Sequence, residues 1–308
     1  MHAAVLHEHG ATPRFGEFDE PSAGPGQVVV DVEAAALHHL DLHKATGTFY
    51  TGPPPLPSVV GTDGVGRLED GRRVYFDVIV PPFGSMGERA LADAESLFDV
   101  PDDLDDAVAA ALSNTALGGW LALSWRSDLQ PGETVCVLGA TGAVGSVAVQ
   151  AAKLLGAGRV VAAARGDLDG VRGADAVVSL ETDDLPAALR DAADGGIDVT
   201  IDTLWGEPAL AAMQAASRHA RHVQVGQIAD ASITLPAPAI RSVSLDVRGF
   251  SVAHPPVELK REAHRRLVEH ARRGDIVIDV ERIRLADVAS AWERQRESAG
   301  GPKLVLIP

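Results

Sequence analysis

A glycine-rich segment in the middle of the chain has the residue types and spacing of an anion-binding turn. An apolar run at 134–138 precedes glycines at 139, 142 and 145, and a run with helical spacing follows. Glycine permits a tight turn and close approach of backbone to a phosphate, and the free N–H groups at a helix start attract the anion. In this strand–turn–helix context the segment predicts a dinucleotide site rather than only a well-packed turn. Its expected cofactor contacts are Gly139, Ala140, Thr141, Gly142, Ala143, Val144 and Gly145.

Arg165 follows the next apolar run, twenty residues after Gly145. An acidic residue at this place would bind the ribose of NAD, whereas a cation suits the 2′-phosphate of NADP. The sequence therefore favours NADPH. The alternative is an exposed arginine that pairs with Asp167 or Asp169.

The composition limits the classes of partner. The 308 residues are 46% hydrophobic and 23% charged, as in a globular protein of about two domains. A net charge of −16 argues against nucleic acid or membrane partners. The single cysteine, Cys136, excludes an intrachain disulfide and a cysteine-rich zinc site, and no secretory signal or long apolar run is visible, so we expect a cytoplasmic protein.

Strand and helix patterns alternate in the second half of the chain. Such alternation predicts an α/β domain with a doubly wound parallel sheet covered by helices on both faces. The expected strands are 134–138, 159–164, 176–180, 198–203 and 222–226, and the expected helices are 144–155, 185–193 and 208–218. The connection 166–175 is too short for more than one or two helical turns.

Outside this region we expect a β-rich lobe and a few helices. Short apolar runs punctuated by glycine and proline predict strands at 28–32, 59–66 and 73–80. Helical patterns cover 105–124, 257–273 and 286–295, and the chain closes with an expected strand at 303–307.

Taken together, several segments resemble the medium-chain dehydrogenase/reductase superfamily, on its zinc-independent quinone oxidoreductase and enoyl reductase side. The resemblance covers nearly the whole chain. Its motifs are the opening strand 1–6, VDVEAAALHHLD at 30–41, GTDGVG at 61–66, PGETV at 131–135, the glycine turn, VQVGQ at 223–227 and GPKLVL at 301–306.

The resemblance implies a GroES-like catalytic domain at 1–115 and 252–308, a Rossmann domain at 116–251, and an active site in the cleft between them. It also implies contacts to ribose, nicotinamide or phosphates from further residues. These are Asp202, Leu204, Gly226, Gln227, Phe250, Ser251 and, for the phosphates, Lys303.

Zinc-dependent members of the superfamily hold their metal with cysteine and histidine. The positions that resemble those ligands here are His38 and Thr62 with Asp63, and threonine is not a competent zinc ligand. His38, His39 and His43 form a cluster in sequence, but two neighbours on a strand would point to opposite faces. We therefore predict an enzyme without a metal, with an unconventional His/Asp zinc site as the alternative.

Reduction without a metal needs hydride from the nicotinamide and a proton from protein or solvent. Tyr50 is the first candidate donor, because related enoyl reductases carry an acidic tyrosine near this position, although Phe49 stands in the straightforward register. The alternative is a tyrosine that lines a substrate pocket through packing alone. His39 is expected to supply a proton near neutral pH, and Asp41 to orient a neighbour or cap a helix. Asn114 is expected to bind a substrate carbonyl or cofactor amide, or to be structural.

The predicted function is an NADPH-dependent reductase of a quinone, an enone or a similar small electrophile. Two alternatives stay open: an alcohol dehydrogenase or ketone reductase with an atypical metal site, and a non-catalytic NADPH-binding sensor or structural protein. The resemblance also implies a homodimer that pairs through an edge of the cofactor sheet, and we expect the stretch 231–240 to form that edge.

Overall fold

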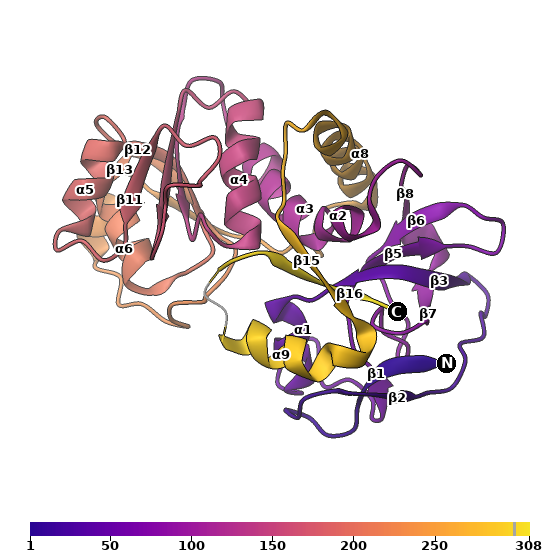
Figure 1. Ribbon diagram of the computed structural model, residues 1–308. Coiled ribbons are helices and arrows are strands. Elements are labelled where there is room, and N and C mark those ends of the chain that lie inside the picture. The colour runs from indigo at the N-terminus through magenta and orange to yellow at the C-terminus, as the bar shows by residue number, and fades with distance from the viewer. Residues whose placement is uncertain (298–299) are drawn as a thin grey trace. The chain divides into compact units, whose positions relative to one another are not determined.

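The computed structural model describes residues 1–297 and 300–308 and divides the chain into two compact units (Figure 1). The first unit contains Met1–Asn114, His264–Arg272 and Ile278–Pro308, and the second contains Thr115–Ala263 and Arg273–Val277. The first division lies beside the expected boundary at 115. The return to the first unit comes at His264, later than the expected residue 252.

The second unit is built on a parallel sheet, as predicted. In the described residues the strand order is β11-β10-β9-β12-β13-β14. The chain moves outward from β9 in one direction and then from β12 in the other, so the order reverses between β9 and β12, where doubly wound folds bind their ligands. The strands are β9 (Thr134–Leu138), β10 (Arg159–Ala164), β11 (Ala176–Ser179), β12 (Ile197–Asp202), β13 (Ala216–Gln224) and β14 (Asp246–Gly249).

Helices complete this unit, with three departures from prediction, of which one is the unexpected helix at Ala237–Arg241. Helix α6 ends at Gln214 instead of 218, because residues from Ala216 onward pair with β12 as strand β13. The connection 166–175 forms turns without a helix. The helices are α3 (Asn114–Leu121), the π-helical η2 (Ala122–Ser127), α4 (Ala143–Leu154), α5 (Leu185–Ala192), α6 (Gly206–Gln214) and α7 (Ala237–Arg241).

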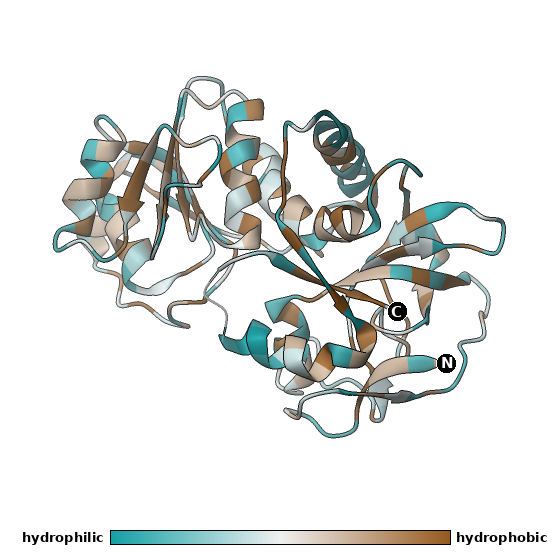
Figure 2. Cartoon of the chain, in the orientation of Figure 1, coloured by the Kyte–Doolittle hydropathy of each residue, from teal (hydrophilic) through white to brown (hydrophobic). Residues whose placement is uncertain are grey.

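The edge of this sheet is not where we expected it. Residues 231–240 form no strand, and β14 occupies the edge beside β13. The sequence pattern missed β14 because its four residues, DVRG, carry two charges and little apolar character. In Figure 2 the strands of the second unit are mostly brown, and its core contains many alanine and valine side chains, which let helices approach the sheet closely.

The first unit is β-rich. A small sheet has the order β2-β1-β4, and a larger one runs β15-β16-β3-β5-β6-β8 with β7 paired to β3, all within the described residues. The strands are β1 (His2–Leu6), β2 (Arg14–Glu17), β3 (Gln27–Ala36), β4 (Ser58–Val59), β5 (Gly64–Arg67), β6 (Arg73–Phe76), β7 (Arg89–Asp93), β8 (Leu97–Asp99), β15 (Val280–Arg284) and β16 (Lys303–Ile307). The strand expected at 59–66 is interrupted because Gly61, at φ +106°, turns the chain between β4 and β5.

Helices α1 (His39–Ala45), α2 (Asp106–Ala111) and α9 (Val288–Glu297) accompany these sheets, with short 3₁₀ turns η1 (Ala94–Ser96) and η3 (Leu285–Asp287). Helix α8 (Val257–Arg273) contributes residues to both units. The helix expected at 105–124 is broken between α2 and α3, because the N–H of Asn114 and the hydroxyl of Ser113 both donate to Asp63.

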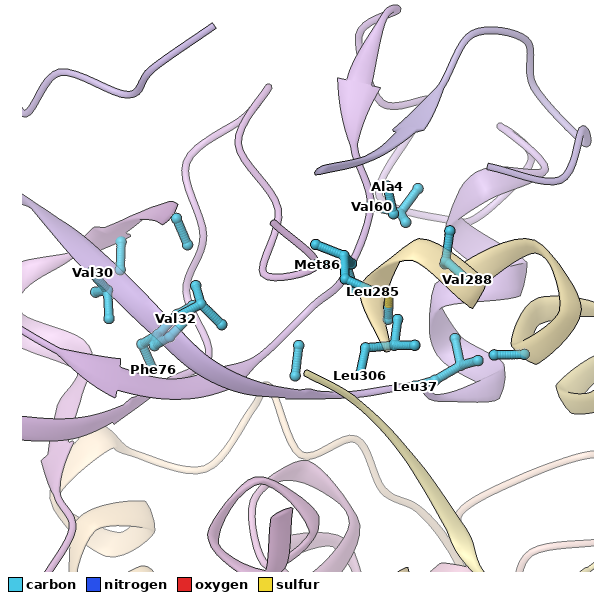
Figure 3. Packing of buried hydrophobic residues seen from close by; sticks show 14 of the residues in the cluster. Ala4, Val30, Val32, Leu37, Val60, Phe76, Met86, Leu285, Val288 and Leu306 are labelled. Carbon is cyan, nitrogen blue, oxygen red and sulfur yellow. The ribbon is translucent and has the colours of Figure 1, made fainter. Parts of the chain in front are cut away.

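The apolar core of the first unit joins strands from both ends of the chain. Figure 3 shows Met86, Leu285 and Leu306 close together, and all three are buried in one cluster. The closing strand β16 pairs with β3 through Leu306 and Ala35. No helix in residues 1–297 and 300–308 is long and apolar enough to cross a membrane.

Candidate active site and cofactor site

The glycine turn of the second unit is crowded at the positions that the sequence singled out. Gly139 follows β9 at φ +81°, and a Cβ there would lie 2.2 Å from Thr203 Oγ1. A Cβ on Gly145 would lie 2.1 Å from the carbonyl oxygen of Gly139. Only glycine fits these two places without displacing Thr203 or the carbonyl group of Gly139.

Helix α4 begins at this turn with unused backbone donors. Gly142 is its N-cap and provides no side-chain acceptor, and the first turn holds no acidic residue. The N–H groups of Ala143, Val144 and Gly145 have no backbone acceptor in the described part of the chain. Free N–H groups at the positive end of a helix fit a pyrophosphate, so these residues could hold the expected cofactor.

Arg165 lies just beyond β10 and is exposed. Among the described residues its guanidinium forms no ion pair, and Asp167 instead accepts the N–H of Asp169 at 2.9 Å. Arg165 is thus available to an anionic ligand, as a contact to a 2′-phosphate requires.

The segment after β12 adjoins the glycine turn. Asp202 is fully buried, and its Oδ1 accepts the N–H groups of Leu204 and Trp205 at 2.8 and 2.9 Å. The predicted contact from Asp202 is therefore not available through its carboxylate, whereas Leu204 is half-buried beside Gly139. Its Cδ2 would lie 3.1 Å from a Cβ at that glycine.

The remaining predicted cofactor residues of this unit follow β13 and β14. Gly226 packs under Thr203, whose carbonyl oxygen would lie 2.5 Å from a Cβ at that position, and Gln227 is exposed. Phe250 is buried against Trp125, with ring centroids 6.3 Å apart, and Ser251 is half-buried. Gly226, Gln227, Phe250 and Ser251 stay predictions as cofactor contacts.

The first unit contains a buried chain of charged and polar groups that joins distant parts of the sequence. Lys303 Nζ lies 2.8 Å from His38 Nδ1 and 2.6 Å from the carbonyl oxygen of Leu37. His38 Nε2 lies 2.7 Å from Asp63 Oδ1. Since the ammonium donates to Nδ1, the ring carries its proton on Nε2 and donates it to the carboxylate.

Asp63 is the most heavily bonded member of this chain. Its Oδ2 accepts from Ser113 Oγ at 2.8 Å, from the N–H of Asn114 at 3.1 Å and from Tyr75 Oη at 3.2 Å. Burial alone raises the pKa of Asp63, but His38, Ser113 and Asn114 outweigh it and hold the pKa below its usual value. Burial, followed by the charge of Asp63, raises the pKa of Tyr75 well above its usual value.

Lys303 makes its contacts within the first unit, and its predicted contact with the cofactor phosphates stays a prediction. Two of its ammonium hydrogens are used within the first unit, and the side chain is almost fully buried. These contacts do not support an approach to cofactor phosphates. Burial lowers the pKa of Lys303 to about 8, although Asp63 and Asp41 act in the opposite direction.

Asp41 and Asn114 have structural contacts. Asp41 Oδ2 accepts the N–H of His38 at 2.8 Å at the start of α1. Asp41 therefore stabilises the helix start as its third residue, whereas the N-cap itself is His38. Asp41 Oδ1 accepts from Thr62 Oγ1 at 2.6 Å. Asn114 uses its main-chain N–H on Asp63. A catalytic role for Asn114 stays a prediction.

Neither Tyr50 nor His39 has the properties of a buried proton donor: Tyr50 is exposed, and the pKa of His39 is lowered. Tyr50 is 73% exposed, with its ring 4.0 Å from that of Phe49. Burial, with a smaller effect from Lys303, lowers the pKa of His39 to about 4, so the ring is neutral near pH 7 and does not match the expected donor. His39 and His43 line a cavity of about 330 Å³ beside Trp292.

The histidine cluster does not form a metal site in the described residues. No group of three or more His, Cys, Asp or Glu side chains there could hold a metal ion. His39 is the first residue of α1 and His38 precedes it, so they diverge at a helix start and not on a strand as we assumed. His38 has a partner at each ring nitrogen.

Sequence reasoning missed several residues that shape these two regions. No motif marks His222, Ser113 or Tyr75, and their roles depend on contacts between separate strands and helices. A signal was visible only for Ser113, as a polar residue inside an alanine-rich helical run. Burial raises the pKa of Cys136 to about 12, which makes its thiol unreactive near neutral pH.

Comparison with known proteins finds one matching family model and several similar oxidoreductases and polyketide synthases. The model of the family described as zinc-binding dehydrogenase matches residues 143–269, a range that excludes His38, Thr62 and Asp63. A phenolphthiocerol/phthiocerol polyketide synthase of Mycobacterium tuberculosis is 30% identical over 300 residues, which are 91% of this chain and 13% of that protein. The chain thus spans a small part of the length of such relatives.

Two shorter relatives are similar in size. The 2-haloacrylate reductase of a Burkholderia species is 29% identical over 223 residues, covering 66% of each chain. The crystal structure of the quinone oxidoreductase from Thermus thermophilus, also solved as its complex with NADPH, has a TM-score of 0.87 and 28% identity over the whole of both chains.

Proposed function

Because the chain belongs to the medium-chain dehydrogenase/reductase superfamily, in its quinone oxidoreductase and enoyl reductase-like branch, we propose that it is an NADPH-dependent reductase of a quinone, enone or similar activated C=C substrate. The activities of two relatives support this class: one is a reductase of 2-haloacrylate and the other is a quinone oxidoreductase that binds NADPH.

The observation that carries the proposal is the glycine turn together with Arg165. The turn provides backbone N–H groups where side chains are excluded, and Arg165 is an exposed cation without an ion pair in the described residues. A dinucleotide with one further phosphate matches this combination. NADPH bound here would supply the hydride.

Residues of the second unit would hold this cofactor, and each group of residues would contact a different part of it. Ala143, Val144 and Gly145 present N–H donors to the pyrophosphate, Arg165 presents a cation to the 2′-phosphate, and Leu204 supplies apolar contact beside Gly139. In the first unit, the groups on Asp63 are committed to one another, so solvent can be the proton source.

The test is NADPH oxidation followed by absorbance, with 1,4-quinones, 2-enals and simple ketones as acceptors, before and after treatment with a chelator. We expect chelator-resistant turnover of quinones or enals. Chelator-sensitive turnover of ketones would instead establish the alcohol dehydrogenase alternative, and NADPH binding without turnover of any acceptor would establish a non-catalytic protein.

The role of Arg165 has its own test. R165Q should weaken NADPH binding by about 10- to 100-fold because a charge-assisted contact is lost. NADH, which lacks the 2′-phosphate, is the internal control and should bind R165Q and wild type within about twofold of each other. Equal weakening for both cofactors would contradict a phosphate-reading arginine.

We also propose a homodimer that pairs through β14. This edge strand has four residues, and the side chain of Val247 is 43% exposed. A V247E variant places a like charge at the same site of both copies. It should therefore elute as a monomer in size-exclusion chromatography with light scattering, and an unchanged mass would reject this edge as the interface.

A further inference from the structure

A buried histidine beside the cofactor turn has no role in the function proposed so far. His222 lies in β13, directly opposite Thr200 of β12, and is 1% exposed. Its Nε2 lies 2.9 Å from Asp202 Oδ2, while its Nδ1 has no hydrogen-bond partner among the described residues. An apolar side chain would fill this place without burying an unpaired polar atom. The His222 ring also lies edge-on to the Trp205 ring, with centroids 6.1 Å apart, but the hydrogen bond to Asp202 is what an apolar residue could not make here.

That contact determines which ring nitrogen of His222 is the donor. A carboxylate oxygen accepts hydrogen bonds, so His222 donates from Nε2 to Asp202. The donor comes from a strand inside the sheet, with β12 on one side and β14 on the other, where it restricts the carboxylate of Asp202 to one orientation.

Asp202 transmits this orientation to the turn that follows β12. Its other oxygen accepts the N–H groups of Leu204 and Trp205. Trp205 has φ +59°, a left-handed conformation that a residue with a side chain keeps only where its surroundings hold it. The carboxylate therefore holds the turn 203–205 in a shape that it would not keep alone.

Residues 203–205 also border the glycine turn at 139–145, which is expected to bind the pyrophosphate. Thr203 Oγ1 donates to the carbonyl oxygen of Leu138 at 2.9 Å, immediately before Gly139. Thr203 Oγ1 would also lie 2.2 Å from a Cβ at Gly139, and the carbonyl oxygen of Thr203 would lie 2.5 Å from a Cβ at Gly226. A shift of Thr203 therefore changes the space at two glycines of the predicted cofactor site.

We propose that His222 is a positioning residue for the dinucleotide: it orients Asp202, which holds the turn 203–205 against the glycine turn. This inference rests on the proposed function in one respect, that the glycine turn binds NADPH. His222 itself touches no cofactor and takes no part in hydride transfer.

The experiment compares H222L, H222Q and T200V in the full chain, with NADPH affinity measured by nicotinamide fluorescence and with kcat and KM for NADPH measured separately. H222L should raise Kd by about tenfold or more and leave kcat at saturating NADPH within about twofold. H222Q retains an N–H donor and should recover most of the affinity. T200V alters the residue paired with His222 without removing the donor to Asp202, so it should bind like wild type.

Wild-type affinity in H222L would overturn the proposal, as would equal weakening in H222L, H222Q and T200V. If H222L does not fold by circular dichroism, D202N replaces it, and normal NADPH affinity in D202N overturns the proposal. Because binding is measured without an acceptor, a wild type that binds NADPH but reduces nothing contradicts the proposed reductase and leaves this test valid.

Discussion

The glycine turn of the second unit and the buried polar network around Asp63 in the first unit are formed by different parts of the residues: the first by backbone groups, the second by side chains. The turn is a surface of backbone N–H groups formed by residues close in sequence, and it is kept bare by the absence of side chains at Gly139 and Gly145. The buried chain consists of side chains, and its members Lys303 and His38 are separated by 265 residues. Damage to the turn should therefore appear in cofactor affinity, and damage to the buried chain in the stability of the fold.

The largest effect is expected at Asp63. D63N replaces a buried carboxylate that accepts four hydrogen bonds from side chains and backbone, and it removes one of the two negative charges that act on the ammonium of Lys303. Breaking a buried charged network costs about 3–5 kcal/mol of unfolding free energy. Denaturant titration measures the unfolding free energy, with the substitution Asp167→Asn at an exposed site as control. A loss below about 1 kcal/mol would mean that the buried polar groups around Asp63 contribute little stability.

The second prediction contrasts a glycine of the turn with a glycine outside it. G145A should raise the Kd for NADPH at least about 100-fold, because its Cβ would meet the carbonyl oxygen of Gly139 at 2.1 Å. A Cβ on Gly16, in β2 of the first unit, would meet nothing within 4 Å, so the affinity of G16A should stay within about threefold of wild type. Fluorescence titration with NADPH measures both, and similar losses would show that backbone crowding is not what shapes the site.

Lys303 gives a prediction about pH. Its pKa falls from 10.5 to about 8 on folding, chiefly through burial, so between these values the unfolded chain binds the additional proton. The unfolding free energy of wild type relative to K303M should therefore rise as pH increases from about 8 to 10.5, by about 2–3 kcal/mol. Urea melts at several pH values measure this difference, and a flat difference would show that Lys303 keeps its ordinary pKa.

The smallest effect is expected at Tyr50. Its ring is exposed and contacts Phe49, so Y50F should change kcat by less than about twofold. Steady-state kinetics with the best acceptor from the panel measures this. A fall of tenfold or more in kcat, with NADPH affinity unchanged, would restore Tyr50 as the proton donor.

Local pattern predicted the second unit better than the first. Strands β9 and β10 are nearly continuous apolar runs, as expected where both faces of a sheet are covered. Five of the six strands were visible in the sequence, although only the last part of the more polar β13 was predicted. The polar β14 was not. In the first unit, short strands such as β7 and β8 have no pattern longer than a few residues, and they were missed because their pairing partners are distant in sequence.

The residues of the candidate site also fall into some that the sequence predicted and some that it did not. Gly139, Gly142 and Gly145 were predicted as a phosphate turn because backbone freedom depends on residue type and on immediate neighbours. The roles of His38, Asp63 and Lys303 were not, because a hydrogen bond between side chains depends on where distant strands bring them. The same reason explains the helix break at Ser113, where a carboxylate from elsewhere takes the backbone donor.

The sequence by itself determined the parallel cofactor sheet, its glycine turn and the cation at Arg165, since each follows from apolar runs, backbone freedom or charge within some thirty residues. Only the tertiary structure decided that Lys303 binds His38, that Asp63 gathers its four donors, and that His222 holds Asp202 beside the glycine turn. Burial makes these contacts specific, because a polar group removed from water must find its partner within the protein, and chain folding alone decides which partner is near.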